Sequence, residues 1–362
     1  MARRALRPVC ATVGALAVAT GSAAAHVDYV TEETAPGSAA ELFAAVMSSP
    51  LALALLAGGG ASVAVAALGY LRFSASLRDV EVARRTLASY RPYLPWMLRL
   101  SVGLPLVGAG FSGYLFSPTV TADARLLQVG IGFLLLFGLL TRVVAAVGLL
   151  AYLWALAGAF PELLLASEYV AGFLGIFVVG PGQPSADMML RRIVAAEGTL
   201  LSRFRWFPKP EDVLSELGLT QGTAPLLIRV FLGANFVYLG VVQKWLQPAQ
   251  AAAVVEKYGL TAVVPVSPEL WIFGAGLTEA VVGVFLLTGT FTRGTATAAF
   301  VILTTTLFGL PDDPVLAHVT LFGLSSALMV TGAGALSLDG TVIPALRRRI
   351  GAGAGGGERP AV

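Results

Sequence analysis

The chain has 362 residues and a mean hydropathy of +0.80, with 56% hydrophobic and only 12% charged residues. A soluble domain has about a quarter charged residues, so this composition excludes an ordinary water-soluble enzyme and a disordered chain. A net charge of +3 also excludes a strongly basic nucleic-acid-binding protein, and a lipid bilayer is the expected partner of most of the chain.

The first 25 residues have the pattern of a secretory signal peptide. Three arginines precede an apolar run, Val13–Ala19, and small residues follow as far as Ala25. This pattern predicts export with cleavage after Ala25, and the alternative is an uncleaved first helix. Both interpretations place the next segment, residues 26–49, outside the cell.

Nine later stretches are apolar and long enough to cross a hydrocarbon layer of about 30 Å, which takes a helix of about 20 residues. They are 50–71, 95–116, 124–141, 143–160, 162–181, 223–246, 268–289, 294–310 and 315–337. The runs are continuous rather than alternating, which predicts helices and not a β-barrel. From an external N-terminus, sixteen Lys and Arg residues fall inside and three fall outside. This bias predicts a multi-pass protein of the cell membrane with a cytoplasmic C-terminus.

The spans divide into one isolated helix and two groups of four. Two segments, Met97–Gly103 and Leu227–Gly233, match at a spacing of 130, and later positions, such as Arg142 and Arg293, match at 151. The spacing indicates an internal repeat with both copies in the same orientation. The expected organisation is an extra transmembrane helix at 50–72, a cytoplasmic amphipathic linker at 73–94, a four-helix unit at 95–190, a cytoplasmic linker at 191–222, a second four-helix unit at 223–340, and a flexible cytoplasmic tail at 341–362.

The second unit carries a distinctive set of glycines and charged residues. They are Arg229, Gly233, Gly240, Lys244, Glu279, Gly283, Leu286, Leu287, Gly289, Thr292, Arg293 and the run Gly-Ala-Gly-Ala-Leu-Ser-Leu that ends at Asp339. This set resembles the DoxX family of small four-helix membrane proteins. The resemblance implies an all-α integral membrane protein with two tandem DoxX-like bundles plus one extra N-terminal helix. The family includes the DoxD-type small subunit of thiosulfate:quinone oxidoreductase, so the resemblance also implies a quinone-linked function with a soluble or membrane redox partner.

The first unit resembles a sister copy that has lost its polar residues. Its residues Tyr114, Gln128 and Ser167 stand at the positions of Lys244, Glu279 and His318. We therefore expect any chemistry to lie in the second unit.

Glu279 is the first candidate catalytic residue. It lies about 12 residues into its span, hence about 18 Å deep at 1.5 Å per residue. A carboxylate at this depth must be protonated, paired or facing a wet cavity, which makes it a functional candidate. The alternative is a purely structural pair with Arg229.

Arg229, Lys244 and Asn235 share one span and are the candidate substrate-binding residues. At about 100° per residue, the two cations fall on one stripe with Gly233 and Gly240. Such small residues predict a close approach to the helix that carries the buried acid. For Lys244 the alternative is a side chain that snorkels to the interface.

His318 is the second candidate catalytic residue. Histidine is suited to proton exchange at neutral pH, and a quinone needs both protons and a hydrogen-bond donor. Asp312 and Asp313 are expected either to hold its imidazole or to cap the helix that follows. A purely structural histidine is the alternative. We expect no metal site, because one cysteine and two histidines are too few to build one alone.

Three functions remain open at this stage. The leading hypothesis is a membrane subunit of a quinone-linked oxidoreductase, in which a pocket beside Arg229, Glu279, Lys244 and His318 receives the quinone or passes protons. The alternatives are a carrier or channel for a small solute, and a membrane scaffold without chemistry. The sequence does not name the electron donor, the solute or the oligomeric state.

Overall fold

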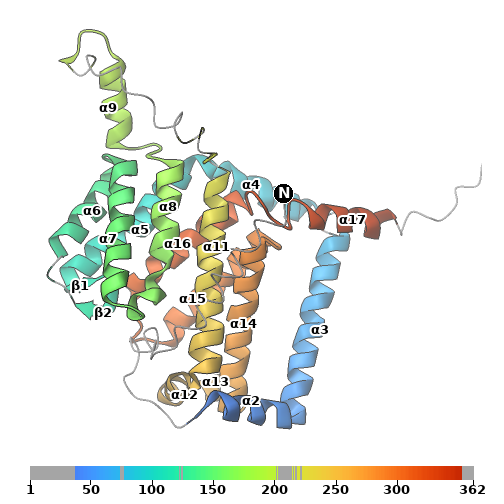
Figure 1. Cartoon of the computed structure of the whole chain (residues 1–362). Coiled ribbons are helices and arrows are strands. Elements are labelled where there is room, and N and C mark those ends of the chain that lie inside the picture. The colour runs from blue at the N-terminus through green and yellow to red at the C-terminus, as the bar shows by residue number, and fades with distance from the viewer. Residues whose placement is uncertain are drawn as a thin grey trace, which may run out of the picture.

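The computed structural model describes residues 37–73, 77–121, 123, 125–200, 202, 214, 216, 218–220 and 222–352. The predicted signal peptide at 1–25 lies outside these residues. The described chain is almost entirely helical, and six of its helical segments are long and apolar enough to cross a membrane. The predicted all-α, multi-pass membrane fold is confirmed (Figure 1).

The N-terminal half contains α2 (Ala39–Ser48), α3 (Pro50–Phe73), α4 (Arg78–Ser89), η2 (Arg91–Tyr93), α5 (Leu94–Ser112), β1 (Tyr114–Leu115), β2 (Ser117–Thr121), α6 (Arg125–Phe137), α7 (Thr141–Gly158), η3 (Glu162–Ala166), α8 (Glu168–Val179) and α9 (Ala186–Ala195). The C-terminal half contains α11 (Thr223–Val237), η5 (Tyr238–Leu246), α12 (Pro248–Lys257), α13 (Leu260–Val263), α14 (Pro268–Thr288), α15 (Thr292–Gly309), α16 (Val315–Thr331) and α17 (Val342–Ala352). The two strands form one short antiparallel pair.

Three of the nine predicted spans fall short of the requirements for crossing a membrane alone. Helix α6 has 13 residues and α16 has 17, while α15 has 18 but is rich in threonine and less apolar. Helix α6 ends at Phe137 because Gly138 adopts a φ of +67°, which a helix cannot continue. By length and composition alone, six helical segments of the described chain are able to cross a membrane, and α6, α15 and α16 do not meet that requirement individually.

Two four-helix units share one hydrophobic core. The first unit is α5–α8, and the second is α11 with η5, α14, α15 and α16; α5 packs against α16, and α8 against α11. At the first of these contacts a Cβ on Gly323 would lie 1.9 Å from Ser101 Cβ, and the Thr320 hydroxyl donates to the Ser101 carbonyl at 3.0 Å. Buried residues from both units, including Leu98 and Ile228, belong to the same cluster.

The two units have matching contacts at the end that carries α4, α9 and α17. Asp187 accepts hydrogen bonds from the N–H groups of Leu140 and Thr141 at 2.7 and 2.8 Å. Asp339 accepts hydrogen bonds from the two equivalent N–H groups at the start of α15, both at 2.8 Å. Each aspartate thus satisfies otherwise unpaired donors at a helix N-terminus.

Helix α3 joins the rest of the protein only near its ends. Its buried residues are Ala52 and Leu71, and it contacts α2 at one end and α17 at the other. Helix α17 corrects the prediction of a flexible tail from residue 341. Its apolar residues, with Ile343 buried, give its first turns a packing surface, and residues 353–362 of the predicted tail lie outside the described residues.

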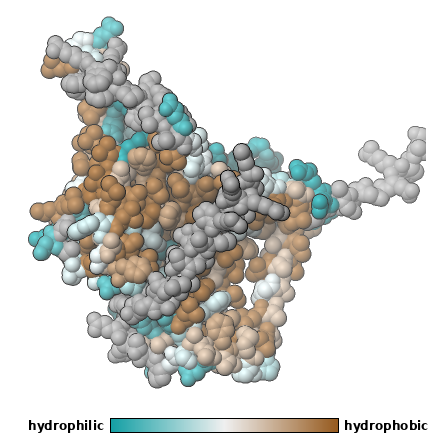
Figure 2. Space-filling view, in the orientation of Figure 1, coloured by the Kyte–Doolittle hydropathy of each residue, from teal (hydrophilic) through white to brown (hydrophobic). Residues whose placement is uncertain are grey.

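The lateral surface is that of a protein in lipid. Large apolar side chains such as Trp154 and Phe308 are 75% and 82% exposed. Figure 2 shows hydrophobic residues along the sides of the helices and hydrophilic residues mainly toward the two ends. The protein is therefore associated with a bilayer.

Candidate functional site

A cavity of about 470 Å³ lies in the second unit, at the end away from α17. Its walls come from η5, α14 and α15, and α12 and α13 cover it. Most of the lining is apolar, including Phe236, Leu239, Ile272 and Leu303. Thr278 of α14 and Thr305 of α15 also line it and are exposed, so the cavity opens laterally between these helices.

The cavity contains a partly buried ion pair. Lys244 Nζ donates to Glu279 Oε2 at 2.6 Å, and the two side chains are only 17% and 13% exposed. The sequence predicted that Glu279 would be protonated, paired or facing a wet cavity, and the structure shows that it is paired. A pair removed from water in this way is costly unless both charges keep their partner, so the two residues depend on each other.

Four glycines bring the two helices of this pair together. A Cβ on Gly233 would lie 2.7 Å from the carbonyl oxygen of Gly283, and one on Gly240 would lie 2.4 Å from that of Gly276. Any side chain at these positions would push the helices apart. The close approach predicted from the small residues is confirmed.

The stripe predicted for the same span is only partly correct. The chain is α-helical as far as Val237 but forms a π-helix from Tyr238 to Leu246. The wider π-turn takes in more residues and rotates Lys244 away from the azimuth that an α-helix would give it. Lys244 does not snorkel, because it is held by Glu279 inside the cavity.

His318 and Asp313 lie together in the same cavity. Nε2 of His318 is 3.3 Å from Oδ2 of Asp313, and its Nδ1 is 3.3 Å from the Pro314 carbonyl oxygen. Burial raises the pKa of Asp313, and the nearby imidazole opposes this increase only in part. Of the two alternatives for Asp313, holding the imidazole is the one found. The carboxyl and imidazole form a second close pair of ionisable groups beside the cavity.

Asp312 has a different role from its neighbour. Its Oδ2 accepts a hydrogen bond from the Tyr258 hydroxyl at 2.7 Å and lies 2.9 Å from Lys257 Nζ. The hydrogen bonds from Lys257 and Tyr258 lower the pKa of Asp312. These contacts fasten the end of α12, part of the cover, to the loop before α16.

Arg229 does not line the cavity, which corrects the prediction that it joins Glu279, Lys244 and His318. It is 1% exposed, and its guanidinium donates to the carbonyls of Ala333, Ala335 and Leu336 at 3.0, 3.0 and 2.6 Å. It also donates to carbonyls at the end of α14. The reason is physical: the five donors of one planar guanidinium match carbonyls of the loop after α16 and of the last turn of α14.

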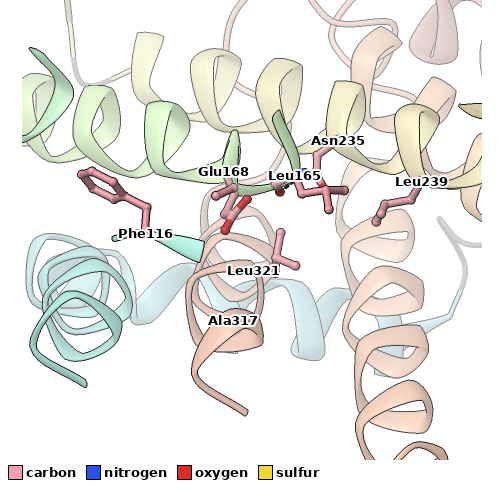
Figure 3. Close-up of a pocket in the computed structure, with 8 residues that line it drawn as sticks. Phe116, Leu165, Glu168, Asn235, Leu239, Ala317 and Leu321 are labelled. Atoms are coloured by element: carbon pink, nitrogen blue, oxygen red, sulfur yellow. Dashed lines mark hydrogen bonds between the residues drawn. The ribbon is translucent and has the colours of Figure 1, made fainter. Parts of the chain in front are cut away.

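Asn235 also lies outside the cavity, a second correction to the predicted site. Its Nδ2 donates to the Leu165 carbonyl at 2.9 Å and contacts Ser167 Oγ at 3.3 Å, so it ties the second unit to the first. It lines a separate small cavity with Glu168, as Figure 3 shows. Glu168 is 4% exposed, and its Oε2 has no hydrogen-bond partner among the described residues.

Sequence reasoning missed Glu168. The residue stands seven positions into a predicted span, at 162–181, and an acid inside a span was the signal that could have found it. Within the described part of the chain, no group of three or more His, Cys, Asp and Glu residues is arranged to hold a metal ion.

Comparison with known families identifies one part of the chain. Residues 224–312 match the family model DoxX. This stretch is DoxX-like. It contains η5, α12, α13, α14 and α15, and so includes Lys244, Glu279 and the cover of the cavity, but it ends before His318. No curated protein and no solved structure matches the chain. The match supports the family expected from the sequence and a membrane location.

Proposed function

We propose that the protein is a membrane subunit of a quinone-linked oxidoreductase, comparable to the DoxD-type subunit, and that the cavity of the DoxX-like region receives the quinone. The observation that supports this most is the combination of a largely apolar cavity of about 470 Å³ with two close pairs of ionisable groups in its lining. Its volume lies in the range typical of small-molecule sites.

The lining fits the chemistry of a quinone. A quinone is a flat apolar ring with two carbonyl oxygens and an isoprenoid tail. Phe236 and Trp271 supply aromatic surface, while Lys244 and His318 supply nitrogen donors for the carbonyl oxygens. The opening between α14 and α15 gives the tail a way into the lipid.

The same residues match the proton requirement of the reaction. Reduction of a quinone to a quinol takes up two electrons and two protons, and oxidation releases them. Glu279 with Lys244, and Asp313 with His318, are the groups proposed to hold those protons. The electrons would come from, or go to, a soluble or membrane redox partner.

The proposal also includes the orientation of the protein in the membrane and the origin of its two units by duplication. The arginines of α4, α9 and α17 favour a cytoplasmic location for that end, so the cavity would face the outer leaflet and the mature N-terminus would lie outside. The matching aspartate contacts of the two units support a duplication, with the first unit as the degenerate copy.

The test is a ligand and partner inventory of the gently solubilised protein in lipid nanodiscs. Mass spectrometry should find a bound quinone and a copurifying redox subunit. Titration with a short-chain quinone should quench tryptophan fluorescence, because Trp271 lines the cavity. We expect Glu279→Gln to weaken binding at least tenfold, since it removes the charge that holds Lys244.

Glu269→Gln is the matched control, because Glu269 lies on the same helix but does not line the cavity. Equal effects of the two variants would contradict the proposal. Solute uptake by proteoliposomes that Glu279→Gln abolishes, without quinone binding, would establish a carrier instead. Unchanged quinone-dependent activity of the partner in cells lacking this protein would indicate a scaffold.

A further inference from the structure

A second cavity, of about 600 Å³, lies at the opposite end of the second unit. It is enclosed by α3, α4, the start of α15, the end of α16 and α17. Apolar residues such as Val80, Leu87 and Ile343 form part of its wall. The other part is basic and contains Arg84, Arg293 and Arg347, residues that the quinone proposal does not use.

The cavity has an excess of positive charge. Three arginines face one acid, Asp339, which leaves a net charge of +2 in the lining. Both oxygens of Asp339 already accept backbone N–H groups at the start of α15. Within the described residues, no ion pair joins Arg84, Arg293 or Arg347 to a carboxylate.

The contacts of these arginines leave donors available. Arg84 Nη2 donates to the Tyr70 hydroxyl at 2.8 Å, and Arg347 stacks over the Tyr70 ring at 5.1 Å. Arg293 Nη2 donates to the Val330 carbonyl at 3.1 Å. The Nε atoms of both Arg293 and Arg347 are buried and have no hydrogen-bond partner among the described residues. Buried guanidinium donors without acceptors point to a missing anion, and phosphate oxygens suit them best.

Helix α3, whose Ala67 and Tyr70 line this cavity, exposes apolar side chains along its length. Between its buried ends, Leu55, Val63 and Leu68 of this helix are 49%, 57% and 57% exposed. The helix is held by α17 at the end near the cavity and by α2 at the other (Figure 1). A ligand whose phosphate sits on the arginines would find apolar side chains of α3 for attached hydrocarbon.

We propose that this basic cavity binds the phosphate headgroup of an anionic phospholipid, whose acyl chains lie along α3. Basic cavities between membrane helices suit such headgroups because charge and apolar surface meet at the depth of the lipid phosphate. The bound lipid would join α3, α4 and α17 to the DoxX-like region. This site is independent of the proposed quinone cavity.

The test is lipid binding to the full-length, delipidated protein, followed by native mass spectrometry. We expect one phosphatidylglycerol to remain bound under conditions that remove phosphatidylcholine. Arg347→Gln should weaken this binding at least tenfold. Arg348→Gln is the matched control, because Arg348 is the next residue of α17, is exposed and does not line the cavity.

A second variant and a competition experiment distinguish a bound lipid from a free phosphate ligand. Arg84→Gln serves as the second variant and should reproduce the loss if Arg347→Gln fails to fold. Inorganic phosphate should compete with phosphatidylglycerol only at far higher concentrations, since it lacks hydrocarbon. Equal retention of the two lipids, or equal losses from Arg347→Gln and Arg348→Gln, would overturn the proposal. Competition by phosphate at concentrations comparable to those of the lipid would replace the lipid by a free phosphate ligand.

Discussion

The first unit contains a packed aromatic cluster, whereas the second unit contains a cavity of about 470 Å³. In the first, the Phe116 ring lies 5.3 Å from Tyr152 and 5.2 Å from Tyr169, and the Tyr152 hydroxyl donates to the Leu163 carbonyl at 2.7 Å. At the spacing of 151, Leu303 stands where the first unit has Tyr152, and Leu303 lines the open cavity. In a close-packed interior, a larger side chain at Leu303 would occupy part of this cavity.

The two units also differ in a polar residue, which is the amide Gln128 in the first unit and the acid Glu279 in the second. Gln128 is 2% exposed; its Oε1 accepts from Phe116 N–H at 2.9 Å, and its Nε2 donates to the Leu106 and Tyr114 carbonyls at 3.2 Å. A neutral amide can be satisfied by backbone groups, whereas the acid Glu279 needs a cation such as Lys244. The first unit therefore closes over its amide, and the second keeps a charged pair beside a cavity.

The largest expected effect concerns the buried arginines, Arg229 in the second unit and Arg99 in the first, which differ in their number of hydrogen bonds. Arg229→Ala should lower the free energy of unfolding by at least about 3 kcal/mol, because it removes the donor from carbonyls of the loop after α16 and of the last turn of α14. Arg99→Ala should cost clearly less, since Arg99 has one hydrogen bond, to Pro184, and its Nε and Nη1 have no partner among the described residues. Unfolding by denaturant in mild detergent measures both. Equal losses would contradict this difference between the units.

The next largest effect is expected for Glu279, and comparison with Gln128 separates its contribution to stability from its contribution to ligand binding. Glu279→Ala should destabilise the protein by about 3 kcal/mol, because it leaves the Lys244 ammonium buried without a partner. Gln128→Ala should cost about 1–2 kcal/mol through its lost hydrogen bonds. Only the first should abolish quinone quenching. The double variant Glu279→Ala with Lys244→Ala should recover part of the stability but not the binding, and recovery of both would exclude a role for the pair in the site.

Exchange of one residue between the units tests the difference in filling directly. Leu303→Tyr should reduce quinone binding at least tenfold, because the larger side chain enters the cavity that Leu303 lines. Tyr152→Leu should open space in the first unit and lower stability by about 2 kcal/mol without affecting the ligand. Fluorescence titration and thermal unfolding report the two outcomes. Unchanged binding in Leu303→Tyr would place the ligand elsewhere.

Much of this arrangement follows from the sequence, and the misses have physical causes. The glycines at Gly233 and Gly240 predicted close helix packing, and the depth of Glu279 predicted a paired or solvated acid. The partners of Arg229 could not be predicted, because backbone carbonyls leave no mark in the sequence. Lys244 was misplaced around its helix because nothing in the pattern announced the π-turns.

The lengths of the helices were harder to predict than their number. Hydropathy predicted nine spans, but the lengths of α6 and α16 depend on where turns begin, such as the left-handed Gly138. The glycine-rich end of the tail concealed the helix that precedes it, α17. Glu168 stands inside a predicted span, so its position marked it as a candidate, but the sequence did not show that Leu165, Asn235 and Leu321 would line the same cavity.

The smallest expected effect concerns the cover, because the Lys257–Asp312 contact is exposed and such pairs contribute little. Asp312→Asn should speed quinone release a few-fold at most, whereas Glu256→Gln, an exposed change on the same helix α12, should not. The hydrogen bonds from Lys257 and Tyr258 hold the pKa of Asp312 below the usual 3.8. The contribution of the contact is therefore complete above pH 3.8 and is lost as the pH falls through the lowered pKa. Stopped-flow release should show wild type approaching the variant only in that acidic range, and convergence near neutral pH would show that another group fastens the cover.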